Sequence, residues 1–168
     1  MAKKTIGILT GGGDAPGLNA VIRAVTWSAI EKGYDVVGFE RGWAGLLNKV
    51  MRPLSISDVA DIHREGGTIL FSSRTNVAKI ENGFETAKKN LVELDIHCLV
   101  AMGGEDTLGV AAQLHEAGGQ VVGAPKTIDN DVNATDYTFG FDTATNRVME
   151  SMDRLHTTAK SHQRVMVV

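Results

Sequence analysis

The sequence predicts an α/β protein with a doubly wound, mostly parallel sheet that carries helices on both faces. Short runs rich in Val, Ile and Leu alternate with longer segments in which apolar residues recur at helical spacing. Glycine-rich or polar loops follow three of the expected strands, and sheets of this class bind ligands outside the carboxyl ends of their strands. The site is therefore expected at one edge of the sheet.

The first half of the chain alternates between expected strands and helices. Apolar runs indicate the strands, and apolar side chains recur at helical spacing after residue 18 until Gly33 ends the first helix. Ser55 or Ser57 can cap the next helix. The strands are expected at residues 5–10 (TIGILT), 34–40 (YDVVGFE) and, after a turn, within 66–73 (GGTILFSS). The helices are expected at residues 18–33, 55–65 and 85–95.

The second half continues the same alternation. Strands are expected at residues 97–102 (HCLVAM), 120–125 (QVVGAP) and 164–168 (RVMVV), and helices at 107–118 and 142–160. Met149 and Met152 lie at helical spacing and are expected to pack, whereas Trp43 is expected to pack within a loop or to make a subunit contact. A buried strand normally continues into another loop and helix, so the final strand predicts that these residues belong to a larger architecture.

Composition narrows the function classes. The chain has 168 residues, a formal net charge of −3 and 43% hydrophobic residues, which suits one globular domain. Its lysines and arginines are scattered among acids, so no nucleic-acid partner is expected. No apolar stretch reaches the ~20 residues of a membrane span, so we expect no membrane partner and a cytoplasmic protein. Cys98 is the only cysteine, which excludes an internal disulfide.

Three loops are expected to converge at the carboxyl ends of their strands. They comprise residues 11–19, 103–107 and 125–136. In the first of them (GGGDAPGLN), glycines allow a close approach of the backbone to a ligand, and the following helix directs free N–H groups toward an anion. A tight turn without a ligand would use the same glycines. No Gly-Lys-Ser/Thr follows, and the spacing does not fit a dinucleotide loop.

The third loop is the richest in chemical groups. Lys126, Thr127, Asp129 and Asp131 lie within six residues, and the two aspartates are at positions i and i+2. In an extended segment both carboxylates would point to one side, where one could accept a proton while the other holds a divalent cation. Hard carboxylate oxygens suit Mg²⁺. The alternative is a solvated turn in which Asn and Asp cap their own backbone.

Five segments together resemble the 6-phosphofructokinase family. They are IGILTGGGDAPGLNAVIRAV, GGTILFSSR, GGEDT, PKTIDND with TDYTFGFDTA, and SHQRV, in the order and spacing of that family. The resemblance covers essentially the whole chain but only about the amino-terminal half of a family member. It implies that residues 1–168 are the donor-binding and catalytic part of a phosphofructokinase fold. Family members transfer a phosphoryl group from ATP or pyrophosphate to the 1-hydroxyl of fructose 6-phosphate with Mg²⁺, and a homo-oligomer is expected for the full-length form.

The resemblance also implies roles for individual residues. Asp129 matches the general base that takes the proton of the sugar hydroxyl, and Thr127 and Asp131 match neighbours that hold the substrate and the catalytic geometry. Arg164 matches an arginine that reaches the sugar phosphate in a neighbouring subunit. The residues implied to bind the donor phosphates are Gly12, Gly13, Arg74, Gly104, Asp106 and Thr107.

The GGEDT loop favours pyrophosphate as the donor. ATP users of the family carry Gly-Gly-Asp-Gly-Ser here, with the acid near magnesium and the second glycine leaving room for the α-phosphate. Glu105 replaces that acid as the implied metal ligand, and Asp106 replaces the glycine, where its carboxylate would fill the space and repel an α-phosphate. Lys126 lies where many ATP users have glycine and can neutralise pyrophosphate.

Three alternatives stay open. The nearest is an ATP-dependent 6-phosphofructokinase. Lipid and NAD kinases use a similar Gly-Gly-acid-Gly-Ser/Thr loop but lack PKTIDND. The third, from another class, is a noncatalytic phosphate-binding half, because the sequence ends before the family's Met-Gly-Arg substrate motif.

Overall fold

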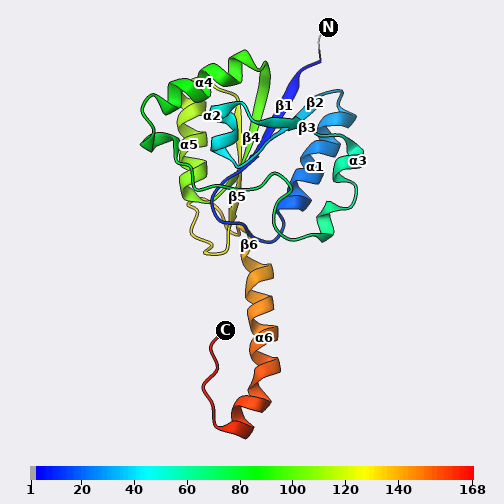
Figure 1. The fold of residues 1–168 in the computed structure, drawn as a ribbon, viewed down its shortest axis with the longest axis vertical. Helices are drawn as coiled ribbons and strands as arrows, with labels where there is room; N and C mark the ends of the chain where they lie inside the picture. Colours follow the sequence, from blue (N-terminus) through cyan, green and yellow to red (C-terminus); the bar gives the residue numbers. More distant parts are fainter. Residues whose placement is uncertain (1–2) are drawn as a thin grey trace.

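The structure is a computed structural model that describes residues 3–168. Within these residues, six strands form one sheet in the order β3-β2-β1-β4-β5-β6 (Figure 1). All neighbouring strands pair in parallel except β2 and β3, so the predicted doubly wound, mostly parallel sheet is confirmed. The strands are β1 (Thr5–Thr10), β2 (Asp35–Phe39), β3 (Met51–Pro53), β4 (Ile96–Gly103), β5 (Val121–Thr127) and β6 (Phe139–Gly140).

Helices cover both faces of the sheet. In Figure 1, α1 (Leu18–Glu31) and α3 (Ile56–Val59) lie on one side, and α2 (Trp43–Asn48), α4 (Gly83–Glu93) and α5 (Glu105–Glu116) lie on the other. Each face of the sheet packs against its own apolar cluster. Strand β1 contributes residues to both clusters, because consecutive strand residues point to opposite faces. Ile8 packs with α1, Leu9 packs with α2 and α5, and both are fully buried.

Two elements between residues 43 and 53 lie where the sequence predicted none. Trp43 opens helix α2 and is 2% exposed in the core, so the predicted packing is correct, but the predicted loop and the alternative of a subunit contact are wrong. Strand β3 then returns antiparallel along β2. Gly45 permits this tight path, because a Cβ there would lie 2.1 Å from the Glu40 carbonyl oxygen.

The predicted helix over residues 55–65 is shorter than expected. Ser55 does cap it: its Oγ accepts from the Asp58 N–H at 3.3 Å, and Asp58 Oδ2 accepts from the Ser55 N–H at 2.8 Å. The helix ends at Val59, and a separate 3₁₀ turn, η1, covers Ile62–Arg64. A second 3₁₀ turn, η2, covers Val77–Lys79.

The short strand predicted within residues 66–73 is wrong. Phe71 has a φ of +57°, which no extended strand adopts. Some of the backbone N–H and C=O groups of this segment bond to side chains, whereas those of a strand would bond to a neighbouring strand. Thr10 Oγ1 donates to the Phe71 carbonyl at 2.8 Å, and Asn19 Oδ1 accepts from the Ile69 N–H at 2.9 Å. The segment is thereby fastened to the end of β1 and the start of α1.

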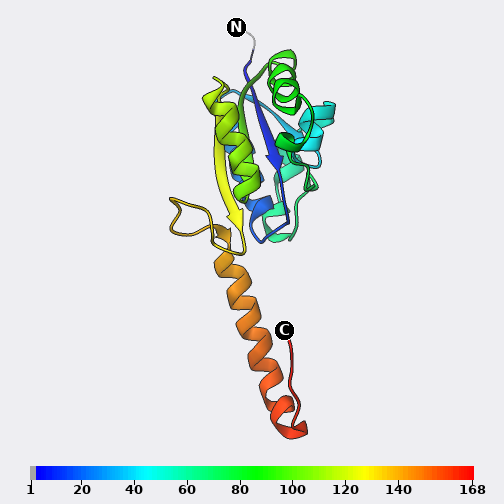
Figure 2. The same ribbon diagram turned by 90° about the vertical axis from the view of Figure 1, so that its left-hand side faces the viewer.

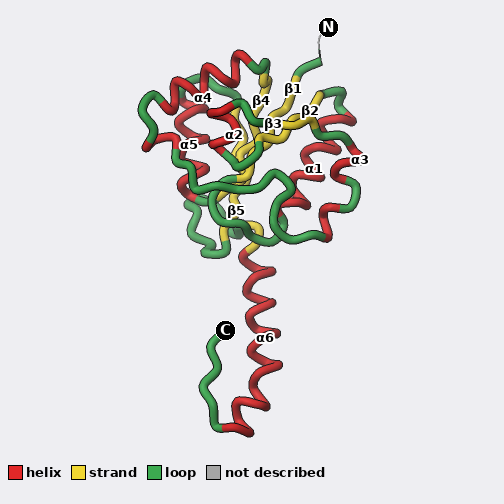
Figure 3. Tube along the Cα trace, in the orientation of Figure 1, coloured by secondary structure: helices red, strands yellow, loops and turns green. Residues whose placement is uncertain are grey.

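Helix α6 (Phe141–His162) extends away from the rest of the molecule (Figures 1 and 2). No residue of this helix, all of which the structure describes, is buried, and Met149 and Met152 are each 56% exposed rather than packed. Residues 164–168 form a loop at its far end instead of the predicted strand (Figure 3). A strand needs a neighbour for its hydrogen bonds, and the sheet lies at the other end of α6. Across the described chain, no helix combines the length and the apolarity that a bilayer crossing requires.

Candidate active site

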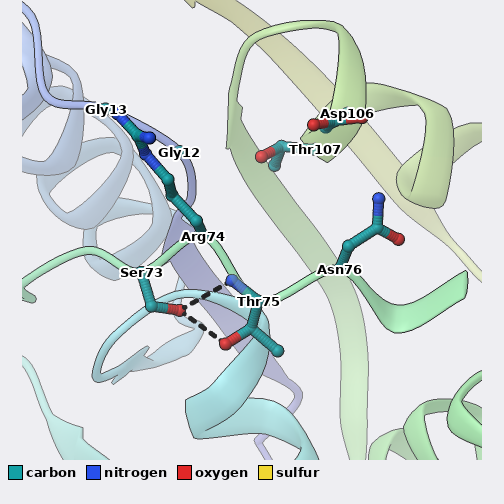
Figure 4. A pocket seen from close by; sticks show the side chains of 8 residues that line it. All are labelled: Gly12, Gly13, Ser73, Arg74, Thr75, Asn76, Asp106 and Thr107. Carbon is teal, nitrogen blue, oxygen red and sulfur yellow. Dashed lines mark hydrogen bonds between the residues drawn. The ribbon is translucent and has the colours of Figure 1, made fainter. Parts of the chain in front are cut away.

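The three predicted loops meet beyond the carboxyl ends of β1, β4 and β5, where they enclose a cavity of about 440 Å³. The lining includes all of the predicted site residues except Arg164. These are Gly12, Gly13, Arg74, Gly104, Glu105, Asp106, Thr107, Lys126, Thr127, Asp129 and Asp131. A smaller hollow of about 270 Å³, lined by Gly12, Gly13, residues 73–76, Asp106 and Thr107, lies along the same loops (Figure 4).

Arg164 lies elsewhere. It is exposed in the loop after α6, where its N–H donates to the Ala159 carbonyl at 2.9 Å. The structure therefore does not bring Arg164 to the cavity that the other predicted residues share.

The glycine loop after β1 is held by backbone and serine contacts. The Gly12 N–H donates to the Ser73 carbonyl at 3.0 Å, and Ser72 Oγ donates to the Gly12 carbonyl. Gly12 has a φ of +78°, a conformation that favours glycine. Ser73 is anchored in turn, since its Oγ donates to the Arg41 carbonyl at 2.7 Å. These contacts place Arg74 next to the glycine loop, and Figure 4 shows its side chain pointing toward Gly12 and Gly13.

The glycines of the site have two different roles. A Cβ at Gly11 would lie 2.5 Å from Thr107 Oγ1, and one at Gly103 would lie 2.4 Å from Thr107 Cβ. These two glycines therefore make room for Thr107, which is 4% exposed between the ends of β1 and β4. A Cβ at Gly13 would meet no atom within 4 Å, so the space beside Gly13 remains open to a ligand.

Glu105 and Asp106 form the exposed first turn of α5. Carboxylates are favourable at this position because the helix N-terminus carries a partial positive charge. Among the described residues that line the larger cavity, five carboxylates face two cations. The carboxylates are Asp14, Glu105, Asp106, Asp129 and Asp131, and the cations are Arg74 and Lys126. A polyanion needs an added cation to bind here.

The carboxylates of the cavity suit a metal ion that also binds the oxygens of a phosphate ligand. No group of three or more His, Cys, Asp or Glu side chains in residues 3–168 is arranged to hold a metal without other ligands. Mg²⁺ commonly takes only one or two carboxylates and completes its shell with phosphate oxygens and water. The exposed carboxylates of this cavity fit that mode of binding.

Lys126 is buried, at 3% exposure, and its Nζ donates to the Gly13 carbonyl. Burial lowers the pKa of its ammonium group, and the charge of Asp14 opposes that shift. The sequence predicted Lys126 as a pyrophosphate contact but missed its bond to the glycine loop. It also missed Asp14, although a charged residue directly after three glycines was the available signal.

The loop after β5 presents Asp129 and Asp131, but not by the predicted geometry. The backbone turns at Asn130, which has a φ of +54°, so the segment is not extended and the i, i+2 argument does not apply. Both carboxylates nevertheless line the cavity. Thr127 Oγ1 lies 3.4 Å from Asp129 Oδ2 and accepts from the Asp129 N–H at 3.1 Å.

A family model described as phosphofructokinase matches residues 5–168. A pyrophosphate–fructose 6-phosphate 1-phosphotransferase of Amycolatopsis mediterranei is 59% identical over 164 residues, which are 97% of this chain and 48% of that protein. An ATP-dependent 6-phosphofructokinase of Streptomyces coelicolor is 53% identical over 97% of this chain and 48% of its own length. The chain thus spans about half the length of these curated relatives.

The fold is also shared with solved structures. Phosphofructokinase from Saccharomyces cerevisiae superposes with a TM-score of 0.83 at 33% sequence identity, over 95% of this chain and 25% of that one.

Proposed function

This chain belongs to the phosphofructokinase family, and from that premise we propose that it is the donor-binding and catalytic amino-terminal part of a pyrophosphate-dependent 6-phosphofructokinase. The reaction moves a phosphoryl group from pyrophosphate to the 1-hydroxyl of fructose 6-phosphate and yields fructose 1,6-bisphosphate. The observation that carries the proposal is the single cavity in which a glycine loop, Arg74, Lys126 and Asp129 meet. The name of the Amycolatopsis relative supports the same donor.

Asp129 is the proposed general base. Its exposed carboxylate can reach a substrate in the cavity, and it accepts the proton of the sugar hydroxyl as that oxygen attacks the phosphorus. The proposed role of Thr127 and Asp131 is to orient the sugar beside it. Phosphoryl transfer depends mainly on positioning and charge neutralisation, and these three groups supply the positioning on the acceptor side.

The proposed donor site consists of Gly12, Gly13 and Gly104 with Arg74, and Thr107 shapes its floor. Backbone N–H groups and the Arg74 guanidinium can donate to phosphate oxygens. The exposed carboxylate of Glu105, which lines the cavity, would hold Mg²⁺. When bound, this ion would offset the charge of the donor phosphates, and the excess of carboxylates in the cavity supports the need for it.

Asp106 and Lys126 are proposed to select pyrophosphate. Asp106 lines both hollows, so its carboxylate would meet the α-phosphate of a nucleotide that followed the glycine loop. Lys126 lies at the loop itself, where its charge favours a compact, highly charged donor. The ATP-dependent alternative rests on the Streptomyces relative, which is only slightly less similar than the pyrophosphate-dependent one.

The proposal includes a cytoplasmic location and a homo-oligomer in the full-length form. The position of Arg164 beyond α6, outside the cavity of its own chain, supports its proposed role in a neighbouring subunit. The noncatalytic alternative is that this chain only binds phosphate.

The test joins residues 1–168 to the remaining half of the Amycolatopsis relative, and we call this protein the hybrid enzyme. Formation of fructose 1,6-bisphosphate is measured with Mg²⁺ and either pyrophosphate or ATP, with the unaltered relative as the control. We expect turnover with pyrophosphate. A folded hybrid that binds pyrophosphate but forms no product with either donor would favour the noncatalytic alternative.

A further inference from the structure

The loop that carries Asp129 and Asp131 is closed by a pair of side chains outside the cavity lining. This loop, residues 128–138, joins β5 to the short strand β6. Both aspartates are exposed, and the loop contains no helix or strand of its own within these described residues. Thr127 Oγ1 contacts Asp129 directly, and beyond that contact the direction of the two carboxylates depends on what holds the loop itself.

Thr138 makes those contacts at the end of the loop. Its N–H donates to Asn130 Oδ1 at 2.9 Å, and its Oγ1 donates to the Thr127 carbonyl at 2.8 Å. Thr138 Oγ1 also lies 3.3 Å from Asn130 Oδ1. Thr138 is 2% exposed, so water competes little for these bonds. Together they tie the end of the loop to its first residues.

Asn130 is suited to its position for two reasons. Its φ of +54° lies in the left-handed region, which asparagine adopts more readily than most residues. Its side chain also accepts the Thr138 N–H that the loop backbone leaves available. Asn130 lies between Asp129 and Asp131, and both of these neighbours line the cavity.

We propose that Asn130 and Thr138 form a clasp that positions the carboxylates of Asp129 and Asp131 for phosphoryl transfer. The inference rests on the proposed function. The clasp fixes the acceptor side of the cavity, while the glycine loop of the donor side is held by the contacts of Gly12 with Ser72 and Ser73 and by the bond of Lys126 to the Gly13 carbonyl. Breaking the clasp therefore lowers kcat and leaves the KM for pyrophosphate nearly unchanged.

The first test compares Thr138→Val with Thr138→Ser in the hybrid enzyme. Valine keeps the branched shape but removes the Oγ1 bond to the Thr127 carbonyl, whereas serine keeps the hydroxyl. We expect valine to lower kcat by about 10 to 100-fold, because small displacements of reacting groups are costly, while the KM for pyrophosphate stays within about twofold. Serine is expected to restore most of the rate. Unchanged kcat in Thr138→Val, or an equal loss in both variants, overturns the proposal.

A second test addresses the other half of the clasp. Asn130→Gly tolerates the left-handed backbone but removes the acceptor for the Thr138 N–H. We expect a loss of kcat similar to that of Thr138→Val, and the double variant should lose little more than either single one, because both changes break the same unit. Losses that multiply in the double variant would contradict the clasp.

A third measurement needs no activity. Hydrogen exchange at the Thr138 amide, followed in the hybrid enzyme, should be slow in the parent and faster in Asn130→Gly, since the substitution removes the acceptor. Equal exchange rates overturn the clasp even if the enzyme is active. An inactive parent in which the Thr138 amide is protected would instead count against the proposed function and leave the loop contacts intact.

Discussion

Replacing Lys126 with methionine removes one ammonium group and keeps most of the side-chain length. In the parent, the ammonium is buried and donates to the Gly13 carbonyl, so the substitution leaves this carbonyl without a charged hydrogen-bond partner. Among the described residues that line the cavity, Arg74 then remains as the only cation. The ammonium has three N–H donors, so one of them can bond a phosphate oxygen in the transition state, and a hydrogen bond to a charged group contributes about 1.5–3 kcal/mol. The expected loss in kcat/KM for pyrophosphate is therefore about 10 to 150-fold.

The assay is pyrophosphate-dependent formation of fructose 1,6-bisphosphate by the hybrid enzyme. Lys32→Met is the matched control, because Lys32 is exposed at the far end of α1 from the glycine loop. If Lys126→Met keeps kcat/KM within about twofold of the parent, the reasoning from its charge is refuted. A loss confined to pyrophosphate with unchanged use of ATP would support selection of the donor.

Three further predictions concern the hybrid enzyme. Asp129→Asn should lower kcat by about 10² to 10⁴-fold while pyrophosphate binding, measured by calorimetry, stays nearly unchanged; near-normal turnover would remove Asp129 from the role of base. Activity should fall at alkaline pH as the Lys126 ammonium loses its proton. Because burial lowers the pKa of Lys126, this fall should occur at a lower pH than the ordinary pKa of lysine would give. Asp14→Asn should move this fall to still lower pH, because the Asp14 charge raises the Lys126 pKa; a fall that stays in place would contradict the assignment. Gly103→Ala should lower the free energy of unfolding by about 1–3 kcal/mol, because the new Cβ would overlap a buried threonine, whereas Gly13→Ala, which has open space, should not.

The sequence predicted those parts of the fold that depend on local patterns. Ile8 and Leu9 occur in a β-branched run, and such a run identifies a central strand before any tertiary contact is known. The convergence of three loops also followed from the order of strands and helices, since the carboxyl ends of parallel strands lie at one edge of a sheet. These predictions needed only periodicity and the topology of the fold class.

The errors occur where distant residues decide the local structure. The sequence of residues 66–73 predicts a strand, but the side chains of Thr10 and Asn19, far away in the sequence, form hydrogen bonds with the backbone of this segment. Trp43 gave no periodic signal because α2 is short. This helix packs against β1 and α4, which are distant in the sequence. Met149 and Met152 have helical spacing, yet the described chain offers α6 no surface on which to pack.

The candidate site shows the same division. Sequence motifs identified nearly all of the residues that line the cavity, whereas only the structure shows which atoms these residues contact. The sequence does not show that Gly11 and Gly103 accommodate Thr107, or that Lys126 donates to the Gly13 carbonyl. It also predicted two aspartates on an extended segment, where the left-handed turn at Asn130 brings them to the cavity by another route.

We propose that Asp106 and Lys126 make this cavity selective for pyrophosphate. The most direct measurement is the ratio of kcat/KM with ATP to kcat/KM with pyrophosphate, determined for the hybrid enzyme and for Asp106→Gly at saturating fructose 6-phosphate and Mg²⁺. We expect the parent to prefer pyrophosphate and Asp106→Gly to raise the ratio, because the substitution removes both the volume and the charge that would meet an α-phosphate. A parent that prefers ATP, or a ratio that Asp106→Gly leaves unchanged, would contradict this proposal.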